Sequence, residues 1–214
     1  MFARSLIRHA WVVWVLVCAM PVLAVGDEAK KSPVPNDEAQ AEARKLIKEA
    51  YWDKYQSAKT SDDKKAFAKM LLDKADENKK DLAAKYVLLI KAKDIAASVS
   101  DGYTAFLAVD KMEQCFEIDA IMMKADLLAK FASVARTPDQ HKSVAEKGLS
   151  LIKEAAAAGN ADALKQLQEL ATDEAKKSKN ASLLKQITER SASTEEIAKA
   201  AEIVQEAEAT LEKD

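Results

Sequence analysis

Residues 81–119 have the sequence DLAAKYVLLIKAKDIAASVSDGYTAFLAVDKMEQCFEID, which contains two units of one local pattern. Each unit begins with an aspartate, Asp81 or Asp101, that can cap a helix, and continues with residues that favour helix. The run Tyr86–Ile90 is apolar on nearly every side, so we expect its helix to be buried between neighbours. Asp119 opens a third unit. The stretch therefore predicts antiparallel helical hairpins joined by tight turns.

The same cap chemistry recurs along the chain and predicts about nine helices. The residues expected to cap the N-termini of these helices are Asn36, Thr60, Asp81, Asp101, Asp119, Thr137, Asn160, Asn180 and Ser193. The clearest start is Thr137-Pro-Asp-Gln140, because it joins a capping residue, a proline in the first turn and a glutamine that completes a capping box. The starts from Asp81 to Asn160 are 20, 18, 18 and 23 residues apart. This spacing is typical of a TPR-like α-solenoid and also of an antiparallel bundle.

Composition supports an all-α fold class. The 214 residues are 49% hydrophobic and 32% charged, with four Gly, four Pro and 6% aromatics. Because tight turns between strands need Gly and Pro, we expect no all-β sandwich and no strand. We expect one helical-repeat domain over residues 37–214, in which Asp101-Gly102 breaks the chain before a fourth helix and Gly159 ends the sixth.

The first 26 residues have the pattern of a secretory signal peptide. Arg4 and Arg8 precede the uncharged run AWVVWVLVCAMPVLAVG at 10–26, which ends in small residues. Cleavage is expected after Ala24, with Gly26 as the alternative, and residues 25–36 are expected to form an extended linker. An uncleaved anchor stays an alternative, because this run has the minimum length of a membrane span. We expect a secreted or periplasmic protein without a membrane span after cleavage.

Few reactive side chains remain beyond residue 26. The chain keeps one cysteine (Cys115), one histidine (His141) and one tryptophan (Trp52), with 31 basic residues against 35 acidic ones. One His and one Cys exclude zinc sites built on these ligands, and no common nucleotide or metalloprotease motif is present. We predict that His141 is an exposed surface side chain, and we predict no catalytic residue, metal or cofactor.

Tyr51, Trp52 and Tyr55 cluster on the first predicted helix and are the candidate partner-binding residues. They either pack onto the second helix or line a groove for a protein partner, since amphipathic aromatics are favoured at interfaces. Cys115 is expected to be a buried core thiol. An intermolecular disulfide through Cys115 is the alternative, because an odd cysteine in an exported chain invites pairing.

The C-terminal segment is a candidate for self-association. Ile197, Val204 and Leu211 repeat every seven residues, so this segment packs on its own domain or on another copy. A nucleic-acid partner is not expected, because the chain is net acidic and its lysines alternate with acids.

Several strings resemble known helical-repeat proteins. AAAAGNADAL at 155–164 resembles a helix junction of Sel1-like or TPR repeats, and SDGYTA at 100–105 resembles a TPR turn. ARKLI at 43–47, AKT at 58–60, KMLL at 69–72 and KYVLL at 85–89 are similar to helical N-terminal domains of large exported planctomycete-type bacterial proteins. The stretch from Gly148 to Ile187 is similar to the second half of those domains.

This resemblance implies export and an all-helical repeat without assigned activity, and it supplies no catalytic residues. Proteins of that family continue beyond the position of Asp214, so the resemblance implies a stand-alone or shortened version. The sequence therefore predicts an exported, non-enzymatic helical-repeat scaffold for an unknown protein partner. Two alternatives stay open: a glycan-cleaving or other carboxylate-based helical enzyme, and a structural helical spacer of the cell envelope.

Overall fold

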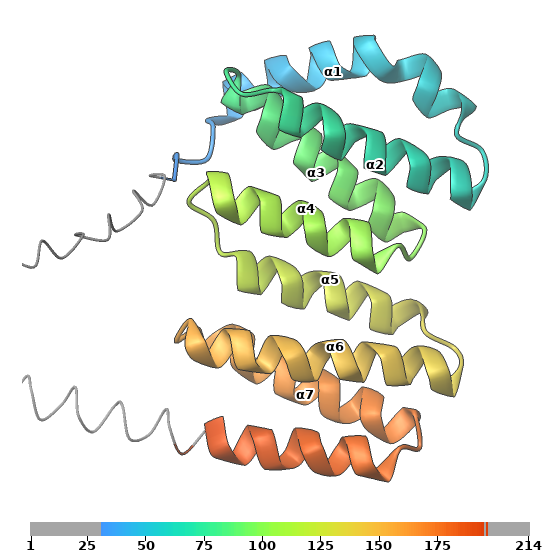
Figure 1. Ribbon diagram of the computed structural model, residues 1–214, viewed down its shortest axis with the longest axis vertical. Helices are drawn as coiled ribbons and strands as arrows, with labels where there is room; N and C mark the ends of the chain where they lie inside the picture. Colours follow the sequence, from blue (N-terminus) through green and yellow to red (C-terminus); the bar gives the residue numbers. More distant parts are fainter. Residues whose placement is uncertain (1–30, 195, 197–214) are drawn as a thin grey trace, which may run out of the picture. The chain divides into compact units, whose positions relative to one another are not determined.

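The computed structural model describes residues 31–194 and 196, and the regular elements within them are helices (Figure 1). The seven labelled helices are α1 (Asp37–Ser57), α2 (Ser61–Glu77), α3 (Leu82–Ser98), α4 (Gly102–Cys115), α5 (Ala120–Val134), α6 (Pro138–Ala157) and α7 (Ala161–Lys177). An eighth helix covers 181–194. The predicted all-α fold class is confirmed, and the predicted count of about nine is close to the eight helices in this part of the chain.

Local cap chemistry explains where these helices begin. In each case the cap side chain accepts a hydrogen bond from the backbone N–H three residues later. These caps are Asn36, Thr60, Asp81, Asp101, Asp119, Thr137, Asn160 and Asn180. Thr60 and Thr137 form complete capping boxes with Asp63 and Gln140. Eight of the nine predicted helix starts are therefore confirmed.

The predicted start at Ser193 is wrong. Residues 193 and 194 continue the eighth helix, and residue 196 is helical too. The hydroxyl of Thr194 donates back to Ser191 O (2.9 Å) and accepts from Gln168 Nε2 (2.9 Å), so it does not cap a new helix. Ile197, Val204 and Leu211 of the predicted ninth helix lie outside the described residues.

Three helix ends share a turn with one left-handed residue. Ser100 (φ 56°), Gly159 (φ 65°) and Lys179 (φ 57°) each stand directly before the next capping residue. Asp101 N donates to Ala96 O (2.9 Å) across the first of these turns. The sequence placed the break after α3 at Asp101-Gly102, but Ser100 takes the left-handed conformation and Gly102 is already the first residue of α4.

The helices stack in sequence order, and within α1–α7 each helix contacts only the helices one or two places away along the chain (Figure 1). Two core clusters follow from this order. The first, between α1 and α4, includes Phe67, Leu71, Leu89, Met112 and Phe116. The second, which extends from Ala68 of α2 to the eighth helix, includes Val109, Leu128, Leu151, Ile152, Leu167 and Ile187. The run Tyr86–Ile90 contributes three buried side chains, Val87, Leu88 and Leu89, as predicted.

A buried cation connects α4, α5 and α6. Lys124 Nζ lies 2.7 Å from Asp110 Oδ1 and 3.1 Å from Glu154 Oε2, and Lys124 is only 8% exposed. Burial acts to lower the pKa of this ammonium, but the hydrogen bonds to Asp110 and Glu154 outweigh burial and raise the pKa above its ordinary value. The pairing therefore stabilises the fold at neutral pH, and this contribution is lost only in strong alkali, as the pH rises through the raised pKa.

The described residues before α1, 31–36, are tied to the stack, and the predicted linker 25–36 lies partly outside the described residues. Ser32 N donates to Cys115 O (2.8 Å), and Ser32 O accepts from Glu117 N (2.9 Å). These two bonds hold the chain against the end of α4. Among the residues that the structure describes, no helix is both long and apolar enough to cross a membrane.

The close approach of α6 and α7 gives a stability prediction. A Cβ at Gly148 would lie 2.7 Å from Ala171 Cβ, whereas a Cβ at Gly102 would meet Phe131 at an ordinary 3.6 Å. We expect Gly148→Ala to lower the free energy of unfolding by about 1–2 kcal/mol, because overpacking outweighs the gain in helix propensity. Gly102→Ala, the matched control, should be near neutral. Urea unfolding followed by circular dichroism measures both, and equal stability of the two variants would contradict the predicted close packing.

Candidate functional site

A groove of about 500 Å³ lies between α1, α2 and α3. It forms because α1 packs mainly on α3 and only lightly on α2, so the first two helices diverge. Its apolar lining consists of Ile47, Tyr51, Trp52, Tyr55, Phe67, Leu71 and Ile95. We call it the α1–α3 groove. All three aromatic residues that the sequence selected as partner-binding candidates line it.

The aromatic side chains of this groove form a chain of ring contacts. The Trp52 and Tyr55 ring centroids are 6.2 Å apart, and those of Tyr55 and Phe67 are 6.1 Å apart. Trp52 is 44% exposed and Tyr55 48% exposed, whereas Tyr51 is half-buried. The two interpretations of this cluster are thus compatible: Tyr55 packs on α2 through Phe67, and two large rings still face solvent along the groove. Their role in binding stays a prediction.

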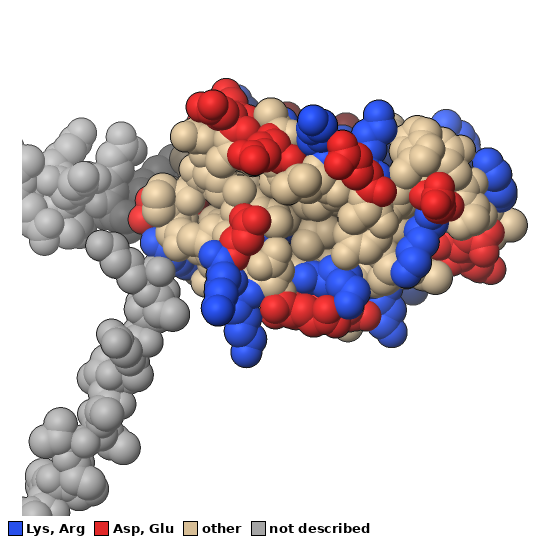
Figure 2. All heavy atoms as spheres, turned by 90° about the horizontal axis from the view of Figure 1, so that it is seen from above, with Lys and Arg blue, Asp and Glu red and all other residues tan. Residues whose placement is uncertain are grey.

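The charged lining of the α1–α3 groove is mostly cationic. Four cations, Arg44, Lys48, Lys64 and Lys91, stand against one acid, Asp94. Lys48 Nζ lies 5.0 Å from the Trp52 ring centroid, a cation–π distance. Figure 2 looks down on the α1 end of the stack, where positive and negative side chains are interspersed with uncharged residues.

This local excess of positive charge is not apparent in the sequence. The four cations come from three helices and are separated by up to 47 residues, from 44 to 91, in a chain that is acidic overall. The only available signal was their helical register relative to Trp52 and Tyr55, since Lys48 lies four residues before Trp52.

A second groove, of about 700 Å³, lies between α4, α5 and α6. We call it the α4–α6 groove. The Phe106 and Phe131 ring centroids are 5.9 Å apart in it, Lys147 Nζ lies 4.5 Å from the Phe106 ring centroid, and Tyr103 is 80% exposed beside them. Asp110 is the one carboxylate among its lining residues, and Lys124 holds that carboxylate.

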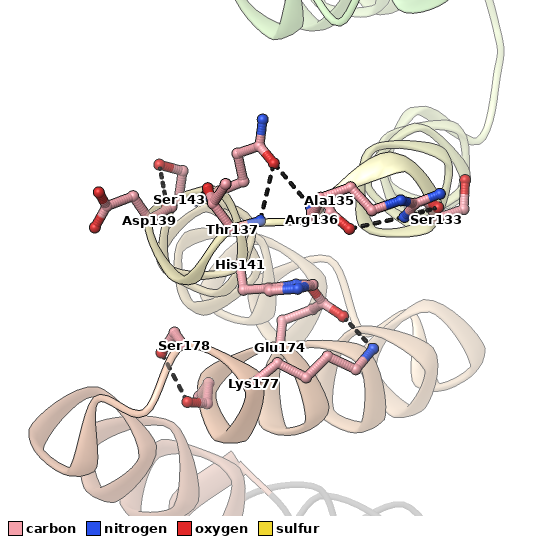
Figure 3. Close-up of polar contacts among 12 residues, drawn as sticks. Ser133, Ala135, Arg136, Thr137, Asp139, His141, Ser143, Glu174, Lys177 and Ser178 are labelled. Atoms are coloured by element: carbon pink, nitrogen blue, oxygen red, sulfur yellow. Dashed lines mark hydrogen bonds and ion pairs between the residues drawn. The ribbon is translucent and has the colours of Figure 1, made fainter.

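The prediction that His141 is exposed is wrong. Its side chain is 15% exposed, and its Nδ1 lies 2.6 Å from Oε2 of Glu174, a fully buried residue of α7 (Figure 3). The other carboxylate oxygen of Glu174 accepts from Lys177 Nζ at 2.7 Å. The role of Glu174 is not apparent in the sequence, because its partner His141 is 33 residues away. Its position seven residues after buried Leu167, on the apolar face of α7, was the available signal.

The His141–Glu174 pair joins α6 to α7, and the hydroxyl of Ser178, at the end of α7, bonds to the backbone instead of to this pair. Ser178 Oγ, drawn in Figure 3, donates to Ala175 O at 2.7 Å. The pKa of Lys177 is raised by its hydrogen bond to Glu174 and by the negative charge of that carboxylate, so Lys177 remains a cation. The arrangement is a charged tie between two helices.

Cys115 is half-buried at the end of α4, where it packs against the first core cluster and is a free thiol. Its intermolecular disulfide stays a prediction. Within residues 31–194, no group of three or more His, Cys, Asp or Glu side chains is placed to hold a metal ion.

No protein-family model, curated protein or solved structure matches the chain. The resemblance to exported planctomycete-type helical domains therefore stays a prediction, and function must be argued from the geometry of the grooves and of the charged ties.

The His141–Glu174 contact makes a testable contribution to stability. We expect His141→Ala to lower the free energy of unfolding by about 2 kcal/mol, because Glu174 Oε2 keeps its burial and loses its partner. Lys142→Ala, one residue along α6, removes only an exposed ion pair with Glu146 and should cost less than about 0.5 kcal/mol. Urea unfolding of both variants tests this, and equal effects would show that the contact carries no net stability.

Proposed function

We propose that the chain is an exported, non-enzymatic, TPR-like helical-repeat protein that holds a protein partner in the α1–α3 groove. The half-exposed pair Trp52 and Tyr55 in a cationic groove carries this proposal. Large aromatic side chains give binding energy at low cost in conformational entropy, and they are enriched at the centres of protein interfaces.

The stacking order supports the repeat architecture. Contacts restricted to the next helix and the next but one are what a solenoid of helical hairpins requires, and the recurring turns at Ser100, Gly159 and Lys179 repeat one connection. Such arrays present extended surfaces between their helices. The α1–α3 groove lies at one end of this array.

The placement of acids favours a binding module over a carboxylate-based enzyme. Cleavage of a glycan needs two carboxyl groups facing one cleft. The α1–α3 groove has Asp94, whose Oδ1 lies 3.0 Å from Lys93 Nζ, and the α4–α6 groove has Asp110, which is held by Lys124. Each of these aromatic grooves therefore offers a single carboxylate, and that carboxylate is already paired with a lysine.

Recognition of a protein partner is tested by crosslinking in envelope extract. We expect the double variant Trp52→Ala, Tyr55→Ala to lose a partner that the unsubstituted chain captures, because both anchors of the groove are removed. Tyr103→Ala is the matched control, since it removes an exposed aromatic from the α4–α6 groove. Quantitative mass spectrometry of the captured proteins is the measurement, and a partner recovered equally by the double variant would contradict binding in the α1–α3 groove.

Export is tested by the mass and the first residue of the protein recovered outside the cytoplasm. We expect the chain to begin at residue 25, or at residue 27 for the alternative cleavage site, because the small residues Ala24 and Gly26 fit a signal-peptide cleavage site. A chain that keeps the signal segment and sediments with membranes would support the uncleaved anchor. Recovery from the cytoplasm alone would overturn export.

A further inference from the structure

We propose that the α1–α3 groove receives residues 197–214 of a second copy of this chain, so that copies associate head to tail. This inference rests on the proposed function, because it names the partner of the same groove.

The charges of the groove and of the segment are opposite. The groove is lined by four cations and one acid. Residues 197–214, IAKAAEIVQEAEATLEKD, contain five acids and two lysines. Complementary charge speeds encounter and disfavours wrong partners, and it makes association sensitive to salt.

The apolar residues of the segment suit an aromatic groove. Ile197, Val204 and Leu211 recur every seven residues, so a helical conformation would place them on one stripe. Laying such a stripe into a groove is a common mode of peptide recognition. Trp52 and Tyr55 would supply the apolar surface that the stripe covers.

The stacking order selects a second copy as the source of the segment. The eighth helix, which leads into this segment, lies at the opposite end of the stack from α1 (Figure 1). If the α1–α3 groove binds the whole segment, the first residue of the segment, Ile197, must lie next to the groove. In the same chain, four helices, α4 to α7, separate the eighth helix from α3, and stacked helices are about 8–10 Å apart. A second copy meets no such obstacle.

A head-to-tail contact leaves one groove and one segment free in every pair, so it continues into chains or rings.

The test uses the chain purified after export and sedimentation velocity over a range of concentrations. We expect species larger than a dimer to grow with concentration and to dissociate as salt is raised. The Tyr103→Ala variant, the matched control, should behave in the same way.

Two variants identify the partners of the contact. The groove variant Trp52→Ala, Tyr55→Ala and the segment variant Val204→Glu, Leu211→Glu should each weaken self-association by about tenfold or more. Circular dichroism verifies that both are folded. An equimolar mixture should form a one-to-one complex and nothing larger, because the intact groove of one variant binds the intact segment of the other.

Other results would overturn the inference. If the segment variant dissociates, the groove variant still associates and their mixture forms no complex, the segments bind one another and the groove is not involved. If the unsubstituted chain stays monomeric while a foreign protein is captured through Trp52 and Tyr55, the head-to-tail contact is wrong and the proposed function stands. If neither association occurs, both proposals fail.

Discussion

No helix of this protein can bury its apolar face alone, and the rest of the structure depends on that constraint. Within α1–α7, each helix covers a face by packing against helices one or two places away along the chain. The approach is close where small residues meet, as at Gly148 and Ala171. Because the helices stack in sequence order, the first and last helices do not meet, and the stack has two ends. At the α1 end, only Gln40 and Ala43 of a 21-residue helix are buried, and the aromatic groove lies beside that incomplete packing.

The sequence predicts the parts of this fold that local interactions determine. Caps such as Asn36 and Thr137 could be identified because the side chain and the N–H that it binds are three residues apart. Burial of Leu88 and Leu89 follows from an apolar run without a polar face. Ser193 has the same local signal as a true cap, but the next residue, Thr194, bonds to Ser191 and to Gln168 of α7. The eighth helix continues through Ser193, and the bond from Gln168 joins this continuation to α7.

Contacts between helices could not be predicted from the single sequence. Glu174 meets His141 only because a turn at Gly159 folds α7 back onto α6, so the polar partner of the histidine is invisible in its own neighbourhood. The aromatic cluster at Tyr51, Trp52 and Tyr55 was found because it lies on one helix. The cations that face it come partly from α2 and α3, and the net acidic charge of the chain concealed them.

The use of charge in the stack also bears on function. Its most buried charged groups have partners on neighbouring helices: Lys124 bonds to Asp110 and Glu154, and Glu174 bonds to His141. A catalytic acid or base needs a pKa and a geometry that are free to serve a substrate, whereas these groups are occupied in holding helices together. The α1–α3 groove has the opposite character, because its rings are half-exposed and its cations lie on its lining. Surface of that kind suits the binding role that we propose, because burial of rings and opposite charge require no reactive side chain.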